Sequence, residues 1–203
     1  DSSGIFNMNG KTLSLKGGSG TPGISQVTPC LKINNGKISN VAGLIAGEIT
    51  YVSGIFENTS PISIDGALKV NGALTFVPGI VVNAGASIMG MWETTVNVMG
   101  SLTNNGTIYD NTGLDGGIVI NVAGDITQNG IYTPEKTVFT GRNVQSLSVG
   151  SDKVITGLWV DEDSAAGIVA ASDIRFDQAK FELANVGSPT GQLDMAGHAV
   201  NIQ

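Results

Sequence analysis

The sequence has few of the residues on which many metal and catalytic sites depend. Its 203 residues include one cysteine, Cys30, and one histidine, His198. A single cysteine excludes an intramolecular disulfide and a thiolate metal cage. A single histidine leaves only one imidazole for a catalytic triad or a histidine-based metal site. We expect His198 to be a surface or stacking residue.

Charge is also scarce. Only 13% of the residues are charged, and 17 Asp and Glu against 10 Lys and Arg give a net charge of −7. The basic residues form no cluster that would displace counterions from a phosphate backbone. The sequence therefore predicts that no nucleic acid is a partner.

Long hydrophobic runs are missing as well. No window approaches the roughly 18 apolar residues of a membrane-spanning helix, so we predict no membrane span. The opening DSSGIF has neither the basic nor the apolar region of a signal peptide. A start without methionine fits a chain whose secretion signal has been removed, and it fits a cloning boundary equally well.

Short strands are the main signal that is present. Segments such as residues 95–98 and 117–122 are rich in β-branched residues and alternate apolar with polar positions. Long stripes of helical periodicity are missing. Between Gly66 and Gly106 the glycines mostly fall five to seven residues apart. Antiparallel sandwiches turn about every 8 to 12 residues, so this spacing favours a coil of shorter strands.

One phrase is written twice in succession. VNVMGSLTNNGTI at residues 96–108 is followed by INVAGDITQNGIY at residues 120–132, which starts 24 residues after it. A solenoid rung uses about 20 to 30 residues, so the repeat predicts two stacked rungs. The predicted stacked pairs are Val96 with Ile120, Val98 with Val122, Leu102 with Ile126, and Ile108 with Tyr132. Asn104 lies under Gln128 in this register, and their amides are expected to form a hydrogen bond along the coil axis.

A looser copy precedes these two phrases. LKVNGALT at residues 68–75 resembles the start of the repeat at an offset of 28 residues. This alignment predicts that Val70 and Leu74 lie over Val98 and Leu102.

The predicted fold is all-β: a right-handed parallel β-helix, or single-stranded β-solenoid, that forms one domain over residues 1–203. Residues 1–50 are a candidate irregular N-terminal cap, because an uncovered terminal rung templates aggregation. Residues 151–203 are predicted to form less regular rungs. No C-terminal cap is evident, so either the natural chain continues or copies stack end to end. An antiparallel β-sandwich that acts as a lectin-like module is the alternative fold.

The repeated phrases, together with TPEKTVFTGRNVQSL at residues 133–147, resemble the Gly/Asn/Thr-rich β-solenoid repeats of large secreted bacterial surface proteins of the adhesin and autotransporter-passenger types. The resemblance covers about residues 66–147. It implies an exported, elongated module that is non-catalytic or contacts carbohydrate, and it transfers no functional residue. DEDSAAG at residues 161–167 departs from the repeat pattern.

An acidic segment at LWVDEDS is one candidate site. Asp161 and Asp163 share one face of a strand beside Trp159. Two carboxylates near a ring are compatible with glycoside hydrolysis, and their oxygens are compatible with a calcium ion, which is the better of the two functional readings. A solvated acidic loop after a buried strand is the ordinary explanation.

A second candidate site is SDIRFDQ, where Asp173 and Asp177 flank Arg175. Carboxylates beside a basic residue on a strand face are similar to the acidic patches of β-helical polysaccharide lyases and hydrolases. Alternating charged and apolar residues are also the ordinary pattern of an exposed strand. Trp92 and Trp159 are candidate aromatic platforms for a sugar ring.

Two functions follow from these observations. The first is a non-enzymatic structural or adhesive module, extracellular or on the cell surface, whose strand faces bind a glycan or another surface protein. The alternative is a β-helical carbohydrate-active enzyme, either a polysaccharide lyase or a glycoside hydrolase, that uses one of the acidic patches.

Overall fold

Strands and their connections make up all of the chain that the computed structural model describes, and no helix occurs in that part. The described residues are 5–7, 13–15, 33–39, 44–46, 48–57, 59–111, 117–155, 158–161, 167–177, 183–186 and 193–202. Side chains are described in 54–57, 59–111, 117–155, 167–177 and 193–202. The all-β prediction is confirmed.

Two long sheets run the length of the molecule. Along the main path of sheet A lie β1 (Ile5–Asn7), β3 (Ile33–Ser39), β5 (Glu48–Glu57), β7 (Ala67–Val77), β10 (Thr94–Val98), β13 (Ile118–Val122), β16 (Lys136–Phe139), β18 (Leu158–Asp161) and β21 (Leu183–Val186). Sheet B contains β2 (Leu13–Leu15), β4 (Leu44–Ala46), β6 (Ile62–Ile64), β8 (Ile80–Val82), β11 (Leu102–Asn104), β14 (Ile126–Gln128), β17 (Gln145–Val149), β19 (Ile168–Ala170) and β22 (Leu193–Asp194).

Five further strands complete the fold. β9 (Ser87–Gly90), β12 (Thr107–Asp110) and β15 (Ile131–Thr133) form a third face that joins sheet A through β7. β20 (Ile174–Phe176) and β23 (Val200–Ile202) form a separate two-stranded sheet near the C-terminal end. The chain therefore passes from sheet A to sheet B, and in the middle of the molecule through the third face, before it starts the next rung.

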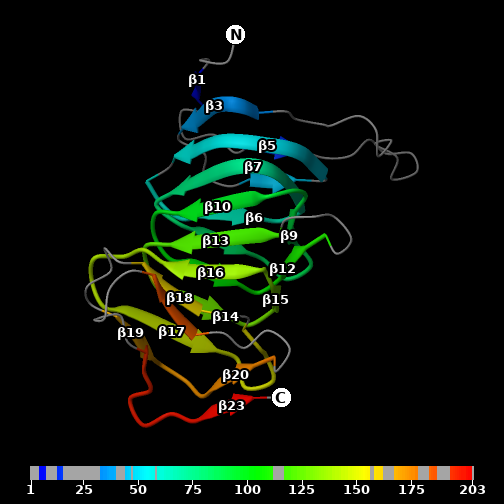
Figure 1. Cartoon of the computed structure of the whole chain (residues 1–203). Coiled ribbons are helices and arrows are strands. Elements are labelled where there is room, and N and C mark those ends of the chain that lie inside the picture. The colour runs from blue at the N-terminus through cyan, green and yellow to red at the C-terminus, as the bar shows by residue number, and fades with distance from the viewer. Residues whose placement is uncertain are drawn as a thin grey trace.

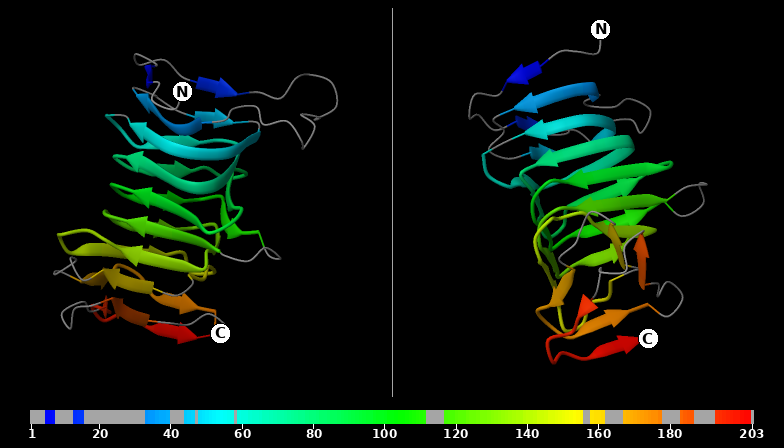
Figure 2. Two further views of the ribbon diagram at one scale, coloured as in Figure 1. Left: turned by 45° about the horizontal axis from the view of Figure 1, so that its top comes forward. Right: turned by 60° about the vertical axis from the view of Figure 1, so that its left-hand side comes forward.

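The coil is parallel and right-handed. Each pairing between described strands is parallel, for example β7 with β10 and β8 with β11. In Figure 1 the front strands of sheet A point left, the chain returns at the right through β9 and β12, and successive rungs descend from the N-terminal end. Figure 2 shows the same stack from two other directions. The predicted β-helix is confirmed, and the antiparallel sandwich is wrong.

The two repeated phrases lie one above the other in the predicted register. Val96 pairs with Ile120 and Val98 with Val122 in sheet A. The same register holds in sheet B, where Leu102 pairs with Ile126 and Asn104 with Gln128, and on the third face, where Ile108 pairs with Tyr132. The repeat therefore predicted the stacking of two complete rungs correctly.

The register predicted for the looser copy is wrong. Val98 pairs with Phe76 rather than Val70, and Leu102 pairs with Ile80 rather than Leu74. The reason is that β7 is one continuous strand of 11 residues that bends at Gly72, where φ is 106°. A glycine tolerates this left-handed backbone conformation. The segment is therefore a bent strand and not a strand, a corner and a second strand.

Inward-facing side chains form continuous columns through the rungs. One column in sheet A consists of Phe56, Phe76, Val98, Val122 and Phe139, which are consecutive register partners. All five are at most 1% exposed, and the rings of Phe56 and Phe76 stack with centroids 5.4 Å apart. Burial of each of these side chains contributes roughly 1.5 to 3 kcal/mol, so the columns are the main source of stability.

The C-terminal end leaves part of its inner face uncovered. Val200 and Ile202 of β23 are 45% and 53% exposed, although their register partners Ile174 and Phe176 are buried. Stacking of a second copy on this end stays a prediction. The predicted cap at residues 1–50 also stays a prediction, because most of that range lies outside the described residues.

Candidate functional site

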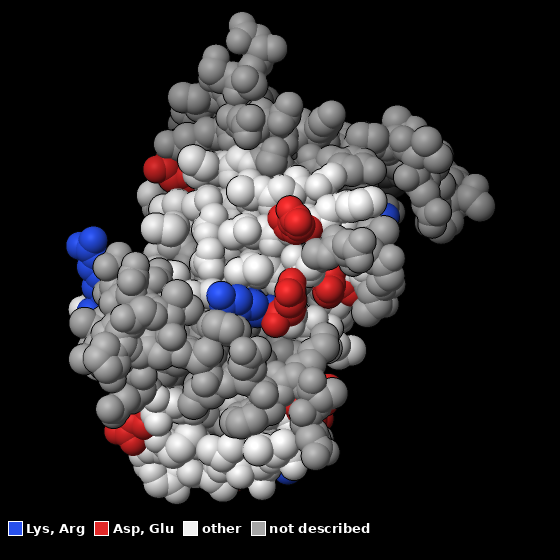
Figure 3. Space-filling model, viewed as in Figure 1, with Lys and Arg blue, Asp and Glu red and all other residues white. Residues whose placement is uncertain are grey.

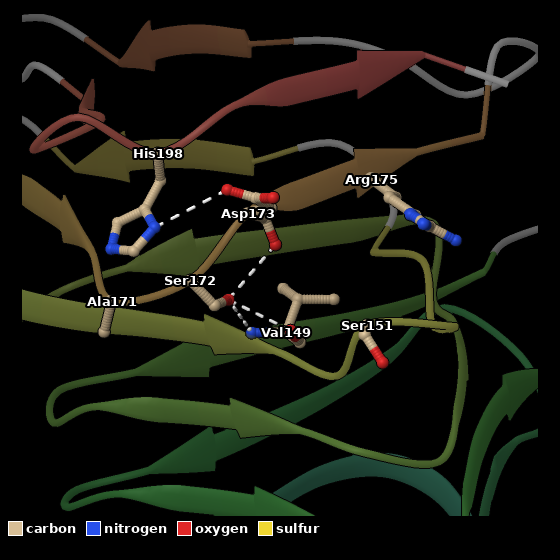
Figure 4. A pocket seen from close by; sticks show the side chains of 7 residues that line it. All are labelled: Val149, Ser151, Ala171, Ser172, Asp173, Arg175 and His198. Carbon is tan, nitrogen blue, oxygen red and sulfur yellow. Dashed lines mark hydrogen bonds and ion pairs between the residues drawn. The ribbon is translucent and has the colours of Figure 1, made fainter.

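A shallow, open pocket of about 430 Å³ lies where the C-terminal ends of β17 and β19 meet β20 and the turn before β23 (Figure 4). It is lined by Val149, Ser151, Ala171, Ser172, Asp173, Arg175 and His198. Asp173 and Arg175 belong to the second candidate site that the sequence predicts, and the fold adds His198 to it from the next rung.

Ser172 fixes the floor of this pocket. Its Oγ accepts a hydrogen bond from the Val149 N–H at 2.7 Å and lies 3.0 Å from the Val149 carbonyl oxygen, to which it donates. Both partners belong to the rung above. The hydroxyl of Ser172 therefore joins two rungs at a corner, and this structural use makes it a poor nucleophile candidate.

A tight turn brings His198 to the pocket. Ala196 and Gly197 have φ values of 48° and 88°, and the His198 N–H donates to the Met195 carbonyl at 2.7 Å. Positive φ at both central residues is the conformation of a type I′ turn. Asp194 supports the turn, because its Oδ1 accepts a hydrogen bond from the Ala196 N–H at 2.8 Å.

The imidazole faces a carboxylate. His198 Nδ1 lies 3.5 Å from Asp173 Oδ1, and the same oxygen accepts a hydrogen bond from the Ala199 N–H at 2.9 Å. The two side chains are 39% and 63% exposed. Solvent screens an interaction between two side chains this exposed, so this contact contributes little to stability.

Arg175 supplies a positive charge on the other side of Asp173. It lies in the middle of β20 between the buried Ile174 and Phe176, so its side chain projects outward. Figure 4 shows the guanidinium directed away from Asp173. Its charge acts on Asp152, whose pKa is lowered mainly by the hydrogen bond from Lys153 and to a smaller extent by Arg175.

Rows of polar side chains on the outer face of sheet B lead toward this pocket. Thr103, Thr127 and Ser148 are consecutive register partners and are partly exposed. Beside them, Asn129 Nδ2 donates to Asn105 Oδ1 at 3.0 Å on the exposed corner that follows β11 and β14. The residue at the corresponding corner after β17 is Gly150, and the pocket residue Ser151 follows it directly.

The structure brings together some of the predicted site residues and not others. Asp173 and Arg175 line the pocket, whereas Asp177 is partly buried just after β20 and is not among the lining residues. Trp92 is 52% exposed beside the start of β10, in an earlier rung. An aromatic platform at Trp92 stays a prediction.

The acidic segment around Trp159 is only partly described. The backbones of Trp159 and Asp161 lie in β18, where Trp159 pairs with Val138 and Asp161 with Val186. Their side chains, and all of Asp163, fall outside the described residues. Among the residues that are described, no three His, Cys, Asp or Glu side chains lie close enough to hold a metal ion. The calcium site at Asp161 and Asp163 stays a prediction.

Sequence reasoning did not connect His198 with Asp173. The signal that links them is their separation, which is close to one rung: Asp173 Oδ1 bonds the Ala199 N–H 26 residues away. In a β-solenoid, two residues that are separated in the sequence by one rung length lie beside each other. A search at this separation finds the pair, provided that the rung length is known.

Charges on the visible face of the molecule are dispersed. In Figure 3 basic groups occur in separate places, and the one in the middle of the face lies next to acidic groups. The described residues include no helix that is long and apolar enough to cross a membrane. Comparison of the chain with protein-family models, curated proteins and solved structures found no match.

Proposed function

We propose that the chain is a non-enzymatic module, extracellular or on the cell surface, that binds a glycan along the outer face of sheet B. The observation that carries this proposal is the in-register row of Thr103, Thr127 and Ser148, with the exposed amides of Asn105 and Asn129 beside it. These groups lead toward the pocket that contains Asp173, Arg175 and His198.

The chemistry of the row fits a polymer of hydroxylated units. A hydroxyl donates one hydrogen bond and accepts others, and an amide side chain does both, so each matches the hydroxyls of a sugar. Strand pairing repeats these groups about every 4.8 Å along the coil. A glycan chain that lies along the coil therefore contacts several rungs at once, and weak contacts add through multivalency.

The test compares glycan binding by the wild-type chain and by a double variant, Thr103→Val and Thr127→Val. Valine keeps the β-branched shape that suits a strand and replaces the hydroxyl with a methyl group. Thr95→Val is the matched control, because Thr95 has the same partly exposed outward position in sheet A. We expect the double variant to bind the glycan ligands at least several-fold more weakly, with the control unchanged.

A glycan array that shows no ligand for the wild-type chain refutes the proposal. Equal binding by the double variant and the wild type would show that the glycan binds to another face of the coil. Binding to a surface protein and to no glycan also refutes the proposal, because the partner then belongs to a different class.

A specific observation favours a second candidate, a carbohydrate-active enzyme. Asp173 lies 3.5 Å from His198 beside Arg175 in one pocket. An imidazole held by a carboxylate accepts a proton as a general base, and a guanidinium stabilises negative charge that develops on a sugar carboxylate. Cleavage of an acidic polysaccharide by the wild type, lost in Asp173→Asn, would establish this function. Binding without cleavage supports the first proposal.

A further inference from the structure

Some polar groups of the pocket form hydrogen bonds within the chain, and others are free to contact a ligand. The Ser172 hydroxyl is committed to Val149, and Asp173 Oδ1 to Ala199 and His198. Within the described part of the chain, the Ser151 hydroxyl and the Arg175 guanidinium form no hydrogen bond or ion pair, although the charge of Arg175 acts on the carboxylate of Asp152. The groups that face a ligand are therefore a hydroxyl, a guanidinium, the second carboxylate oxygen of Asp173 and the outer face of the imidazole.

The backbone of Arg175 is fixed by strand pairing on both sides. On one edge of β20, Arg175 pairs with Asn201 of β23. On the other edge, the backbone carbonyl of Arg175 accepts a hydrogen bond from the Ile155 N–H at 2.9 Å. The neighbours Ile174 and Phe176 are buried in the core. The side chain of Arg175 therefore starts from a fixed backbone position and lines one side of the pocket.

The available groups are separated by charge. In Figure 4 Arg175 lies on one side of Asp173 and points away from it, and His198 lies on the other side. An anionic group of a ligand is attracted to the Arg175 rim and repelled from Asp173. Hydroxyls that donate hydrogen bonds are favoured at Asp173, and Ser151 and His198 offer further contacts to hydroxyls. The matching ligand has a negative group at one end and hydroxyls at the other.

We infer that this pocket binds a carboxylate-bearing sugar unit, such as a uronic acid residue within a glycan, with its carboxylate on Arg175 and its ring hydroxyls on Asp173, His198 and Ser151. This inference rests on the proposed glycan-binding function and names the ligand class of the pocket at the end of the polar row. A planar guanidinium pairs with a planar carboxylate through two parallel hydrogen bonds, which gives this group an advantage over a neutral sugar.

The test uses the full 203-residue chain and calorimetric titration. One ligand is an oligomer of uronic acid, and the other is the same oligomer with its carboxyl groups reduced to alcohols. Arg175→Gln is expected to weaken binding of the acidic oligomer about tenfold or more, with little effect on the reduced one. Asp173→Asn is expected to weaken both, because both ligands carry the hydroxyls.

Arg142→Gln is the matched control. Arg142 is exposed on the connection after β16 and is not among the pocket residues, so this variant makes the same change of net charge elsewhere. We expect it to bind both oligomers as the wild type does. Thermal unfolding of all variants confirms that each has folded, since an outward-facing substitution on a strand costs little stability.

The possible results separate this inference from the proposed function. Equal affinity of the wild type for the acidic and the reduced oligomer overturns the inference and leaves glycan binding intact. An equal loss in Arg142→Gln and Arg175→Gln assigns the effect to general charge attraction and also overturns it. Tighter binding of a sulfated oligomer without carboxyl groups refutes the carboxylate assignment. Binding of no glycan at all overturns both proposals.

Discussion

The side-chain amide of Asn104 lies directly above that of Gln128 inside the coil. Asn104 Nδ2 donates to Gln128 Oε1 at 2.8 Å and to the Ile131 carbonyl at 2.9 Å, and its Oδ1 accepts a hydrogen bond from the Gly106 N–H at 3.1 Å. Both amides are fully buried. The Asn104 side chain therefore provides hydrogen-bond partners for backbone groups near a corner, where strand pairing provides none.

Asn104→Ala is expected to destabilise the chain by about 1 to 3 kcal/mol, because it leaves a buried backbone N–H and a buried amide oxygen without a partner. Asn105→Ala is the control, because Asn105 belongs to the parallel ladder on the exposed corner. Its removal is expected to change stability by less than about 0.5 kcal/mol. Urea unfolding measures both values. Equal costs for the two variants would contradict the role of burial.

Gly130→Ala is expected to cost about 1 to 3 kcal/mol or to prevent folding. A Cβ added at Gly130 would overlap the carbonyl oxygen of Gly106 in the rung before it. That oxygen is fixed because it accepts a hydrogen bond from the Ile131 N–H at 2.8 Å. The backbones of successive corners are therefore too close for any side chain, which explains why both phrases of the repeat have glycine at this position.

Gly150→Ala is the control for this experiment. The nearest atom to a Cβ at Gly150 is Lys153 Cγ at 3.1 Å, which belongs to a flexible side chain that can move. We expect a change of less than about 0.5 kcal/mol in the free energy of unfolding. Comparable destabilisation by both alanines would show that the cost comes from glycine's backbone freedom and not from the contact between corners.

Phe76→Ala is expected to destabilise the chain by about 3 to 5 kcal/mol, since it opens a cavity in a column that continues above and below it. Phe76 is fully buried and stacks on Phe56. Trp92→Ala is the control, because it removes a larger ring that is half exposed. Chemical unfolding should show a much smaller change for Trp92→Ala. A similar loss for both would place Trp92 in the core.

The sequence predicts stacking only where successive rungs have the same length. Val98 and Val122 could be paired correctly because their two rungs share their corners as well as their strands. From β13 to β16 the rung is shorter, and Val119 pairs with Lys136, so no phrase is repeated there. Without a repeat, nothing in the sequence sets the register of one rung over the next.

The candidate site shows the same limit. Asp173 and Arg175 lie close in the sequence, at the start of one strand, so local structure places them together. His198 joins them only because a long rung and the turn at Ala196 and Gly197 return the chain to the same place. Local patterns do not encode such a return, and the pocket could not be predicted from them.

Tyr132 offers a probe of the core that responds to pH. Its ring is buried, and its hydroxyl forms a hydrogen bond of 2.8 Å with the hydroxyl of Thr137, which is also buried. Burial raises the pKa of Tyr132 well above its ordinary value of 10.0, since a phenolate would lose its hydration in the core, and the hydrogen bond from Thr137 opposes this only in part.

Because its folded-state pKa is raised, the contribution of Tyr132 to stability is fully present below about pH 10 and is lost as pH rises toward the raised value. In this range the unfolded state releases a proton that the folded state keeps. The free energy of unfolding of the wild type should therefore fall above pH 10 by up to about 1.4 kcal/mol per pH unit more than that of Tyr132→Phe.

At neutral pH the Tyr132→Phe variant should be less stable by about 0.5 to 1.5 kcal/mol, because Thr137 loses its partner. Urea unfolding at several pH values measures both effects, with Tyr109→Phe on the partly exposed third face as the control. Parallel pH curves for the wild type and Tyr132→Phe would show that water reaches the Tyr132 hydroxyl and that the column is not closed at this rung.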